Sequence, residues 1–379
     1  MRGDKPVRIL HFFGGMNRGG AETMIMNIYR HIDRAKVQFD FAVHTKEQCH
    51  YDNEIMDLGG RIIHLPSPAK AGPRLYRRSL MQVLHKYGPF QGVHSHVYYY
   101  SGFIMRIAQK AGLTLRISHS HSTQDSKTDT MKRRIYRQFM RYLILKYSTH
   151  LFGCSRAAGQ HLFGPDCDSD FRFKVIPNAI ELSKFKLGNK HELREKLLLP
   201  VNVPLIGHVG RFHEAKNHKF LIKIFHALLK KLPDAHLVLV GDGSLKNEVE
   251  TIIHAKGIDN HVHMLGVRDD VPLIMSALDL FLFPSLYEGL PVVLIEAQAA
   301  GVPCVVSDVI TREVDMKLGL VEFVGLQSGI DLWVERVLRC LQLERPRFEE
   351  RFAGLKAAGY DVEQVATDLE VLYSNSLVI

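Results

Sequence analysis

The segment from residue 281 to residue 308 constrains the fold more than any other part of the sequence. Two apolar runs of strand length, 278–283 and 302–306, flank a helical pattern over 291–300. Pro291 suits the first helical turn, Gly301 can adopt the left-handed conformation that ends a helix, and Pro303 prevents its continuation. Strand, helix and strand in this order indicate one unit of a parallel α/β sheet.

The loop between the first strand and this helix has the features of an anion-binding site. Free amides of Gly289, Leu290 and Val292 would point out of the sheet edge, where the start of a helix attracts negative charge. Glu288 lies just before them in the loop, and Glu296 lies about a turn and a half inside the helix. A pyrophosphate between two hydroxyl-rich sugars would match this arrangement.

Either glutamate alone could be a solvated charge on an exposed helix face. Glu288 and Glu296 are, however, the only acidic residues between Asp279 and Asp308, in a segment that is otherwise apolar. Burying a carboxylate is costly unless a partner binds it. The position of the two residues therefore favours a role in binding.

Two basic residues, Arg211 and Lys216, follow directly after another apolar run of strand length, 205–209. Fixed cations at the end of a strand can neutralise a diphosphate leaving group without a metal ion. An Arg and a Lys five positions apart are common by chance. Their place after a strand, upstream of the two glutamates, makes the combination specific.

The first half begins with a buried strand over 7–13, a glycine-containing loop over 14–20 and a helical pattern from residue 21. Such a loop lets backbone approach a phosphate or a sugar closely, and Gly19 and Gly20 are its candidate residues. The G-x-G-x-x-G spacing of a dinucleotide-binding loop is absent. A plain tight turn is the alternative interpretation.

Further runs of strand length alternate with helical patterns and predict a second parallel sheet. They cover 37–44, 61–65, 92–97, 115–119, 150–154 and 173–177. Ligands of such sheets bind at the carboxyl ends of the strands, where His94, His96, His119 and His121 fall. His121 directly follows its strand and is the preferred candidate, with His119 as the alternative.

These motifs together resemble the signature of the retaining glycosyltransferases of family 4. Glu288 and Glu296 are separated by seven residues and are followed by Gly301 and Pro303, as in that signature. The sequence Gly-Gly-Ala-Glu at 19–22 and the spacing of Arg211 and Lys216 match two other motifs of the family. The resemblance covers nearly the whole chain and is strongest to bacterial enzymes of exopolysaccharide and capsule assembly. One departure is at position 179, where Ala stands in place of the usual Gly.

The resemblance implies a GT-B fold, an α/β architecture of two Rossmann-like domains whose parallel sheets face each other across a cleft. It implies an N-terminal acceptor-binding domain over 1–181, a linker over 182–204 and a nucleotide-sugar-binding domain over 205–355. The last segment, 356–379, would be a helix crossing back to the first domain. Asp361 marks the start of this helix, and its apolar stripe consists of Val362, Val365, Leu369 and Leu372.

The resemblance also implies an activity: transfer of a hexosyl group from a nucleoside diphosphate sugar, expected to be UDP-linked, in surface polysaccharide synthesis. The acceptor would be a saccharide or a polyprenyl-linked saccharide, the configuration would be retained, and neither a metal nor a cofactor would be needed. The catalytic residues would be His121, Glu288, Arg211 and Lys216. Donor binding would add further residues, namely Gly19, Gly20, Val267, Gly289, Leu290 and Glu296.

Two other functions fit parts of the pattern. A nucleotide-sugar epimerase can have the same two domains, but the complete set of Arg211, Lys216, Glu288 and Glu296 argues against it. A non-catalytic subunit that binds nucleotide sugar would be expected to lack one of these charges. A Ser-His-Asp triad, a zinc-ligand set and a Walker loop were not found, so hydrolase and phosphotransferase functions have no support.

Charge is distributed unevenly along the chain. Residues 1–190 contain 30 Lys and Arg against 14 Asp and Glu, a net charge of +16, whereas the remainder carries −7. Within the segment 127–146, which begins with Lys127 and ends with Lys146, five further basic residues accompany apolar residues at helical spacing. The basic residues are Lys132, Arg133, Arg134, Arg137 and Arg141; the apolar residues are Ile135, Phe139, Tyr142 and Leu143.

Three interpretations of this basic segment are possible: the solvated face of a core helix, a helix that faces anionic lipid, or a nucleic-acid-binding helix. The last lacks a recognition motif or an aromatic platform, so no nucleic-acid partner is expected. Five scattered cysteines, no apolar run of about 18 residues and an N-terminus without a signal-peptide core predict a cytoplasmic protein. We expect it to be peripheral on the inner face of the cell membrane.

Overall fold

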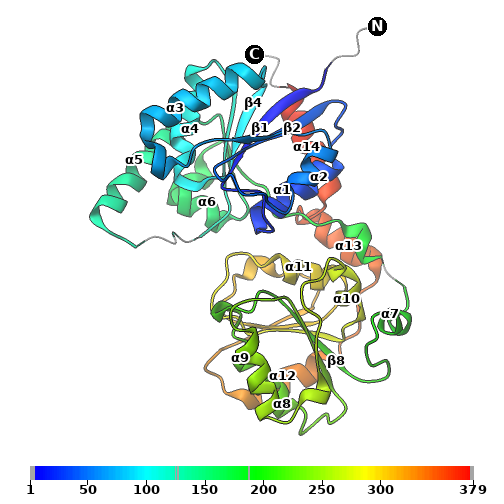
Figure 1. The fold of residues 1–379 in the computed structure, drawn as a ribbon. Helices are drawn as coiled ribbons and strands as arrows, with labels where there is room; N and C mark the ends of the chain where they lie inside the picture. The colour runs from blue at the N-terminus through cyan, green and yellow to red at the C-terminus, as the bar shows by residue number, and fades with distance from the viewer. Residues whose placement is uncertain (1–4, 124, 126–127, 187, 376–379) are drawn as a thin grey trace. The chain divides into compact units, whose positions relative to one another are not determined.

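The chain separates into two compact units that are joined at two points. The computed structural model describes residues 5–123, 125, 128–186 and 188–375. Unit 1 comprises residues 1–180 and 359–379, and unit 2 comprises residues 181–358 (Figure 1). Each unit is a parallel sheet covered by helices on both faces, which confirms the predicted α/β fold class.

The sheet of unit 1 has the strand order β3-β2-β1-β4-β5-β6-β7, and all its pairings are parallel. Its strands are β1 (Val7–Phe13), β2 (Val37–Val43), β3 (Ile62–His64), β4 (Gly92–Ser95), β5 (Leu115–Ser120), β6 (His150–Gly153) and β7 (Phe173–Val175). The strand order reverses between β1 and β4. Loops that leave these two strands therefore diverge and open a crevice at their carboxyl ends.

Alternate residues of the central strands fill two separate cores. Ile9 and Phe39 pack against the helices α1 (Gly20–His31), α2 (Asp52–Asp57) and α14 (Val362–Asn375). Leu10 and Phe12 face the opposite way, toward α3 (Pro68–Tyr87) and α4 (Ser101–Lys110). The helices α5 (Met131–Tyr147) and α6 (Arg156–Phe163) complete that second layer.

The helix α14 belongs to unit 1 although it lies at the C-terminal end of the chain, as predicted (Figure 1). Val365 and Leu369 are buried in the same core as α1, and Tyr373 is fully buried. The Tyr373 hydroxyl lies 2.8 Å from Nδ1 of His94 on β4. The last turns of the chain therefore reach the carboxyl ends of the central strands of unit 1.

The helix α5 differs from the expectation for a core helix. Of its predicted apolar stripe only Leu143 is buried, whereas Ile135, Phe139 and Tyr142 are 59%, 50% and 54% exposed. Met131 at the start of the helix is 70% exposed. Lys127, which was included in the predicted segment, lies outside the described residues. Ile135, Phe139 and Tyr142 therefore face away from the core of unit 1, whereas Met140, Leu143 and Ile144 pack into it.

The sheet of unit 2 has the order β10-β9-β8-β11-β12-β13 and is also parallel throughout. Its strands are β8 (Leu205–Val209), β9 (His236–Val240), β10 (Val262–Met264), β11 (Leu280–Phe283), β12 (Cys304–Ser307) and β13 (Val321–Val324). The strand β13 was not predicted because it is a short edge strand that is mostly half-buried. The order reverses between β8 and β11.

Helices cover both faces of this second sheet as well (Figure 1). The helices α8 (His218–Leu228), α9 (Lys246–Ala255) and α12 (Ile330–Cys340) enclose a core around Trp333. The opposite face carries α10 (Val271–Ala277), α11 (Val292–Ala299) and α13 (Phe348–Ala357). Among the described residues, no helix has both the length and the apolar character required to cross a bilayer.

Residues 182–204, which were expected to link the domains, pack within unit 2. Their helix α7 (Lys190–Lys196) contacts α10. Buried Arg194 pairs with Asp279 at 2.5 Å and donates a hydrogen bond to the carbonyl of Ala277 at 2.8 Å. A buried arginine with this many partners anchors the segment firmly, because removing one partner leaves an uncompensated charge.

The packing of α14 generates a first prediction. Replacing Leu369 by Ala should lower the free energy of unfolding of unit 1 by about 2–5 kcal/mol, because it leaves a cavity in a closed core. Hydrogen exchange resolved by unit should show faster opening of β1 and β2, with unit 2 unchanged. The matched control is Val371→Ala on the same helix, since Val371 is 52% exposed. Equal effects of the two variants would contradict this account of α14.

Candidate active site

Two loops of unit 2 meet at the point where its strand order reverses. One loop follows β8 and the other follows β11, and each supplies a hydrogen bond to the other. The amide of Leu286 donates to the carbonyl of Ala215 at 2.8 Å, and Asn217 Nδ2 donates to the carbonyl of Pro284 at 3.1 Å. Asn217 has a φ of 54°, a left-handed conformation that Asn tolerates better than most residues. Sequence reasoning missed this residue.

Lys216 and Glu288, one from each loop, form an ion pair with an Nζ–Oε1 distance of 2.7 Å. Their side chains are only 17% and 16% exposed, and Lys216 Nζ also lies 4.7 Å from the centre of the Phe283 ring. A Cβ atom on Gly210 would lie 3.0 Å from Lys216 Cε, so glycine gives the lysine stem its room. The structure thus brings together two residues that were predicted as separate ligand contacts.

Arg211 occupies the same loop but points outward. It is exposed and forms no ion pair with any residue that the structure describes. The next residue, Phe212, is buried, and its amide donates to the carbonyl of Asp242 at 3.0 Å. This anchor turns the Arg211 guanidinium group toward solvent, where it is available to an anionic ligand.

Backbone amides add positive character beside the Lys216–Glu288 pair. The helix α11 begins at Val292, and no side chain caps its N-terminus. Within the described part of the chain, the amides of Gly289, Leu290 and Val292 have no hydrogen-bond acceptor. Pro291 is the N-cap residue and not part of the first turn as predicted, because its ψ of 104° is extended. The expected anion site at this helix start is therefore open.

Glu296 lies on α11 and is half-buried. Burial raises the pKa of its carboxyl group from 4.5 to about 7. Its side chain makes neither an ion pair nor a hydrogen bond with any described residue. A desolvated carboxyl group without a partner is costly, which is the expected property of a group that awaits hydroxyl donors from a ligand.

Val267 lies in the loop after β10, on the other side of β8. Its side chain is 64% exposed, and the preceding Gly266 has a φ of 66°. The Gly266 carbonyl accepts a hydrogen bond from the amide of Gly241 at 2.8 Å, which ties this loop to the end of β9. The backbone at Val267 is therefore fixed at the same carboxyl edge of the sheet.

The glycine loop of unit 1 ends at the start of α1. Gly19 is the N-cap residue, with no side chain capping the helix, and Gly20 is the exposed first helical residue. A Cβ atom on Gly20 would meet nothing closer than Asn178 Nδ2 at 3.8 Å. The loop leaves β1 where the strand order of unit 1 reverses. The approach of this loop to a ligand stays a prediction.

Five histidines gather at the carboxyl ends of β1, β4 and β5, and we call them the histidine cluster: His11, His94, His96, His119 and His121. The rings of His119 and His121 lie 4.1 Å apart, so both candidates share one location. His119 is fully buried, whereas His121 is partly exposed, which keeps His121 as the residue able to touch a ligand directly. Burial lowers the pKa of His121 to about 3, so its ring is neutral.

Comparison with solved structures agrees with the fold. HepE of Anabaena, solved with UDP, aligns over 98% of both chains with a TM-score of 0.71 and 18% identity. A glycosyltransferase of Rickettsia africae aligns over 98% of this chain and 99% of its own, with a TM-score of 0.78 and 15% identity. Two parallel-sheet units, each with a reversal of strand order, together with these alignments, show that the protein has the GT-B fold.

Sequence comparison identifies the family. The family models "Glycosyl transferase 4-like domain" and "Glycosyl transferases group 1" match residues 19–179 and 189–343. EpsF of Bacillus subtilis, which is named as a glycosyltransferase, is 40% identical over 371 residues and 97% of both chains. CapH of Staphylococcus aureus, named for capsular polysaccharide biosynthesis, is 26% identical over 77% of this chain and 78% of its own. The chain belongs to the family 4 glycosyltransferases.

The raised pKa of Glu296 generates a second prediction. Between pH 4.5 and about 7 the folded state keeps a proton that the unfolded state loses, so stability falls as pH rises through this window. Glu296→Gln removes the ionisation. We expect this variant to be more stable than the parent protein at pH 8 by about 2 kcal/mol, with the difference shrinking toward pH 4.5.

Denaturant unfolding of unit 2 at the two pH values measures this difference. Glu335→Gln, a substitution of an exposed helical glutamate in the same unit, is the control and should show no such pH dependence. If the unfolding free energies of Glu296→Gln and the parent protein differ by the same amount at pH 4.5 and at pH 8, the Glu296 carboxyl group ionises normally.

Proposed function

We propose that the protein transfers a hexosyl group from a UDP sugar, with retention of configuration, to a saccharide or polyprenyl-linked saccharide in surface polysaccharide synthesis. The observation that carries the proposal is the Lys216–Glu288 pair beside the free amides of Gly289 and Leu290. Support also comes from the relatives. An Escherichia coli enzyme, 29% identical over 246 residues and 63% of both chains, is named as a UDP-galactose galactosyltransferase acting on GlcNAc-diphosphoundecaprenol.

The residues of unit 2 divide the donor between them in this proposal. The diphosphate binds to Arg211, Lys216 and the amides at the start of α11. A phosphate oxygen then replaces Glu288 as the ion-pair partner of Lys216. Glu288 then accepts hydrogen bonds from the sugar hydroxyl groups. Glu296 accepts them from the ribose, and the backbone at Val267 holds the base.

Charge stabilisation is the main contribution of these groups to the reaction. When the bond from the anomeric carbon to the diphosphate breaks, its electron pair goes to the departing oxygen, and the fixed cations and amides stabilise that charge. The acceptor attacks the oxocarbenium-like centre from the same face. We propose that this requires no metal ion, since two cations and a helix start occupy the place where an ion would act. The role of His121 in contacting the sugar stays a prediction.

Product analysis with a panel of nucleotide sugars tests the function. We expect UDP release only when a saccharide or polyprenyl diphosphate saccharide acceptor is supplied, an α-linked product from an α-linked donor, and equal rates with and without EDTA. An epimerase would convert the donor without any acceptor. A non-catalytic subunit would bind the donor, seen as a thermal shift, and release nothing. Either result would overturn the proposal.

The Lys216–Glu288 pair generates a third prediction. Lys216→Ala should leave the fold intact and lower turnover by about 10²–10³-fold, the usual effect of removing one group that stabilises a departing anion. The control is Lys219→Ala, which removes an exposed lysine that pairs with Glu248 on the neighbouring surface and should change turnover less than twofold. Near-normal turnover of Lys216→Ala would remove this residue from the mechanism.

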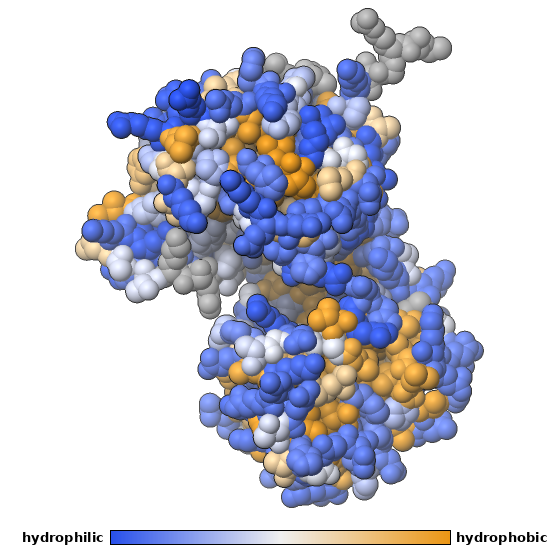
Figure 2. Space-filling model, in the orientation of Figure 1, coloured by the Kyte–Doolittle hydropathy of each residue, from blue (hydrophilic) through white to orange (hydrophobic). Residues whose placement is uncertain are grey.

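We further propose that α5 places unit 1 on an anionic lipid surface, where a polyprenyl-linked acceptor would be found. The positive charges of α5 support lipid binding less than the sequence indicated, because two of the arginines are paired with carboxylates. Arg133 binds Asp125 at 2.8 Å and Arg137 binds Asp129 at 2.5 Å. What supports the proposal is the exposed apolar side of α5 beside exposed Lys132. Figure 2 shows orange and pale side chains among blue ones at the projecting end of this helix.

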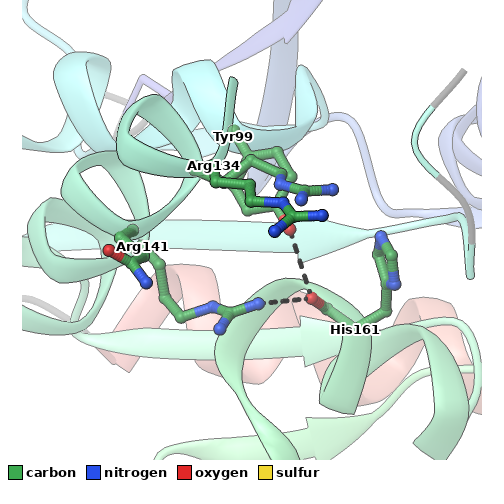
Figure 3. A pocket seen from close by; sticks show the side chains of 6 residues that line it. Tyr99, Arg134, Arg141 and His161 are labelled. Atoms are coloured by element: carbon green, nitrogen blue, oxygen red, sulfur yellow. Dashed lines mark hydrogen bonds between the residues drawn. The ribbon is translucent and has the colours of Figure 1, made fainter. Parts of the chain in front are cut away.

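A basic pocket of about 360 Å³ opens beside this apolar side, between α5 and α6. Its lining residues are Tyr99, Arg134, Arg137, Gln138, Arg141 and His161 (Figure 3). Arg141 is held there, since it donates to the carbonyls of His161 and Leu162 at 2.9 Å each. Nε2 of His161 is buried without a hydrogen-bond partner. Guanidinium groups at the rim of an apolar helix face suit the phosphate of a lipid headgroup.

Liposome sedimentation gives a fourth prediction. Ile135→Asp/Phe139→Asp should reduce binding to vesicles containing phosphatidylglycerol by at least tenfold, because each buried apolar side chain contributes about 1.5–3 kcal/mol. Lys132→Glu should weaken binding less and lower its salt sensitivity. Phe171→Asp is the control, since Phe171 is 97% exposed elsewhere on unit 1. If the wild type sediments equally with anionic and neutral vesicles, α5 is only a solvated surface.

A further inference from the structure

The histidine cluster has a density of imidazole groups that sugar transfer does not explain. The parallel register of β1 and β4 pairs His11 with His94, and His96, His119 and His121 follow at the same carboxyl edge. No acidic residue of the described chain forms an ion pair with any of the five. The cluster is therefore a set of uncharged nitrogen ligands gathered in one place.

The nitrogen atoms of His96, His119 and His121 are spaced as a metal-binding triplet would be. One ring nitrogen of each lies within 4.8 Å of the other two. His96 Nδ1 and His121 Nε2 are 2.8 Å apart. Three nitrogens around a tetrahedral zinc ion, at about 2.0–2.1 Å from the metal, lie roughly 3.4 Å from one another. Small rotations of the rings would reach this spacing.

Partners outside the triplet hold two of its rings in place. His94 Nε2 lies 3.2 Å from His119 Nδ1, and the other nitrogen of His94 contacts the Tyr373 hydroxyl at 2.8 Å. His11 Nδ1 lies 3.2 Å from His96 Nε2. Hydrogen bonds of this kind to the far nitrogen of a ligating histidine fix its tautomer and orient its lone pair.

His119 Nε2, the nitrogen of its ring that does not contact His94, is buried without a hydrogen-bond partner. A neutral imidazole has the free lone pair that a metal requires. A second triplet of His11, His94 and His96 also meets the spacing, but two of its members are fully buried. The first triplet is the more accessible, because His96 and His121 are both partly exposed.

We propose that His96, His119 and His121 form a binding site for a divalent transition-metal ion of the zinc, copper or nickel class. Imidazole suits these ions, and three histidines with one position left for water make a complete coordination shell. The site is distinct from the transfer chemistry proposed for unit 2, which needs no ion. Metal binding at this site would inhibit sugar transfer, a consequence that rests on the proposed function. A metal held by His121 would occupy the ring that is predicted to contact the sugar.

Metal titration of the untagged, chelator-treated full chain tests the site without any sugar substrate. We expect the wild type to bind one equivalent of Zn²⁺ in calorimetry and to give the visible absorption of a nitrogen-ligated ion with Co²⁺. His96→Gln and His121→Gln should each weaken Zn²⁺ binding at least tenfold and abolish the Co²⁺ spectrum. The control is His236→Gln/His263→Gln, which removes another pair of adjacent imidazoles, 3.0 Å apart, in unit 2.

Unchanged Zn²⁺ binding in the cluster variants, or loss of binding in the control, would overturn the proposal. Circular dichroism checks that each variant is folded. His121 is partly exposed at the end of its strand, so His121→Gln decides the question if His96→Gln does not fold. Because binding is measured without donor or acceptor, a failure of the proposed transferase function leaves this test intact.

Discussion

The reversal of strand order beside β1 and beside β8 is the constraint on which both candidate sites depend. Parallel strands place every carboxyl end at one edge, and at the reversal the helices that follow the two central strands cross to opposite faces of the sheet. In unit 2 the loops after β8 and β11 are then free to face each other, and two hydrogen bonds hold them together. The Lys216–Glu288 pair exists only because this topology brings residues 72 positions apart into contact.

Sequence patterns were sufficient to predict the strands and helices that depend on local periodicity. The strands β1 and β8 begin and end where their apolar runs predicted, and both glutamates fall on the predicted loop and helix. The pairing of Lys216 with Glu288 was beyond the sequence because it is a contact between distant loops. Asn217 carried a weak local signal, as an Asn in a turn. His11 and Tyr373 carried none, since one is inside a strand and the other is near the end of the chain.

The helix α5 shows how periodicity can mislead. The predicted residues Ile135, Phe139 and Tyr142 have the spacing of a core-facing stripe, yet their side chains are exposed. Met140 and Ile144 pack into the core with Leu143, next to arginines that bind Asp125, Asp129 and backbone carbonyls. A guanidinium group can satisfy its five donors against a protein surface, and its apolar stem packs there as well. Pattern alone cannot determine which apolar residues of a helix are turned inward when arginines on the same side also find partners.

The position of α14 sets an order on the folding of the chain during synthesis. Unit 2 has all its residues once position 358 has been made, but the core of unit 1 stays open until Val365 and Leu369 arrive. Domains usually fold in the order of their synthesis. Here the sheet of unit 1, which is translated before unit 2, must wait for residues that are translated after unit 2. Until then, the apolar residues of β1 and β2 that pack against α14 lack part of their cover.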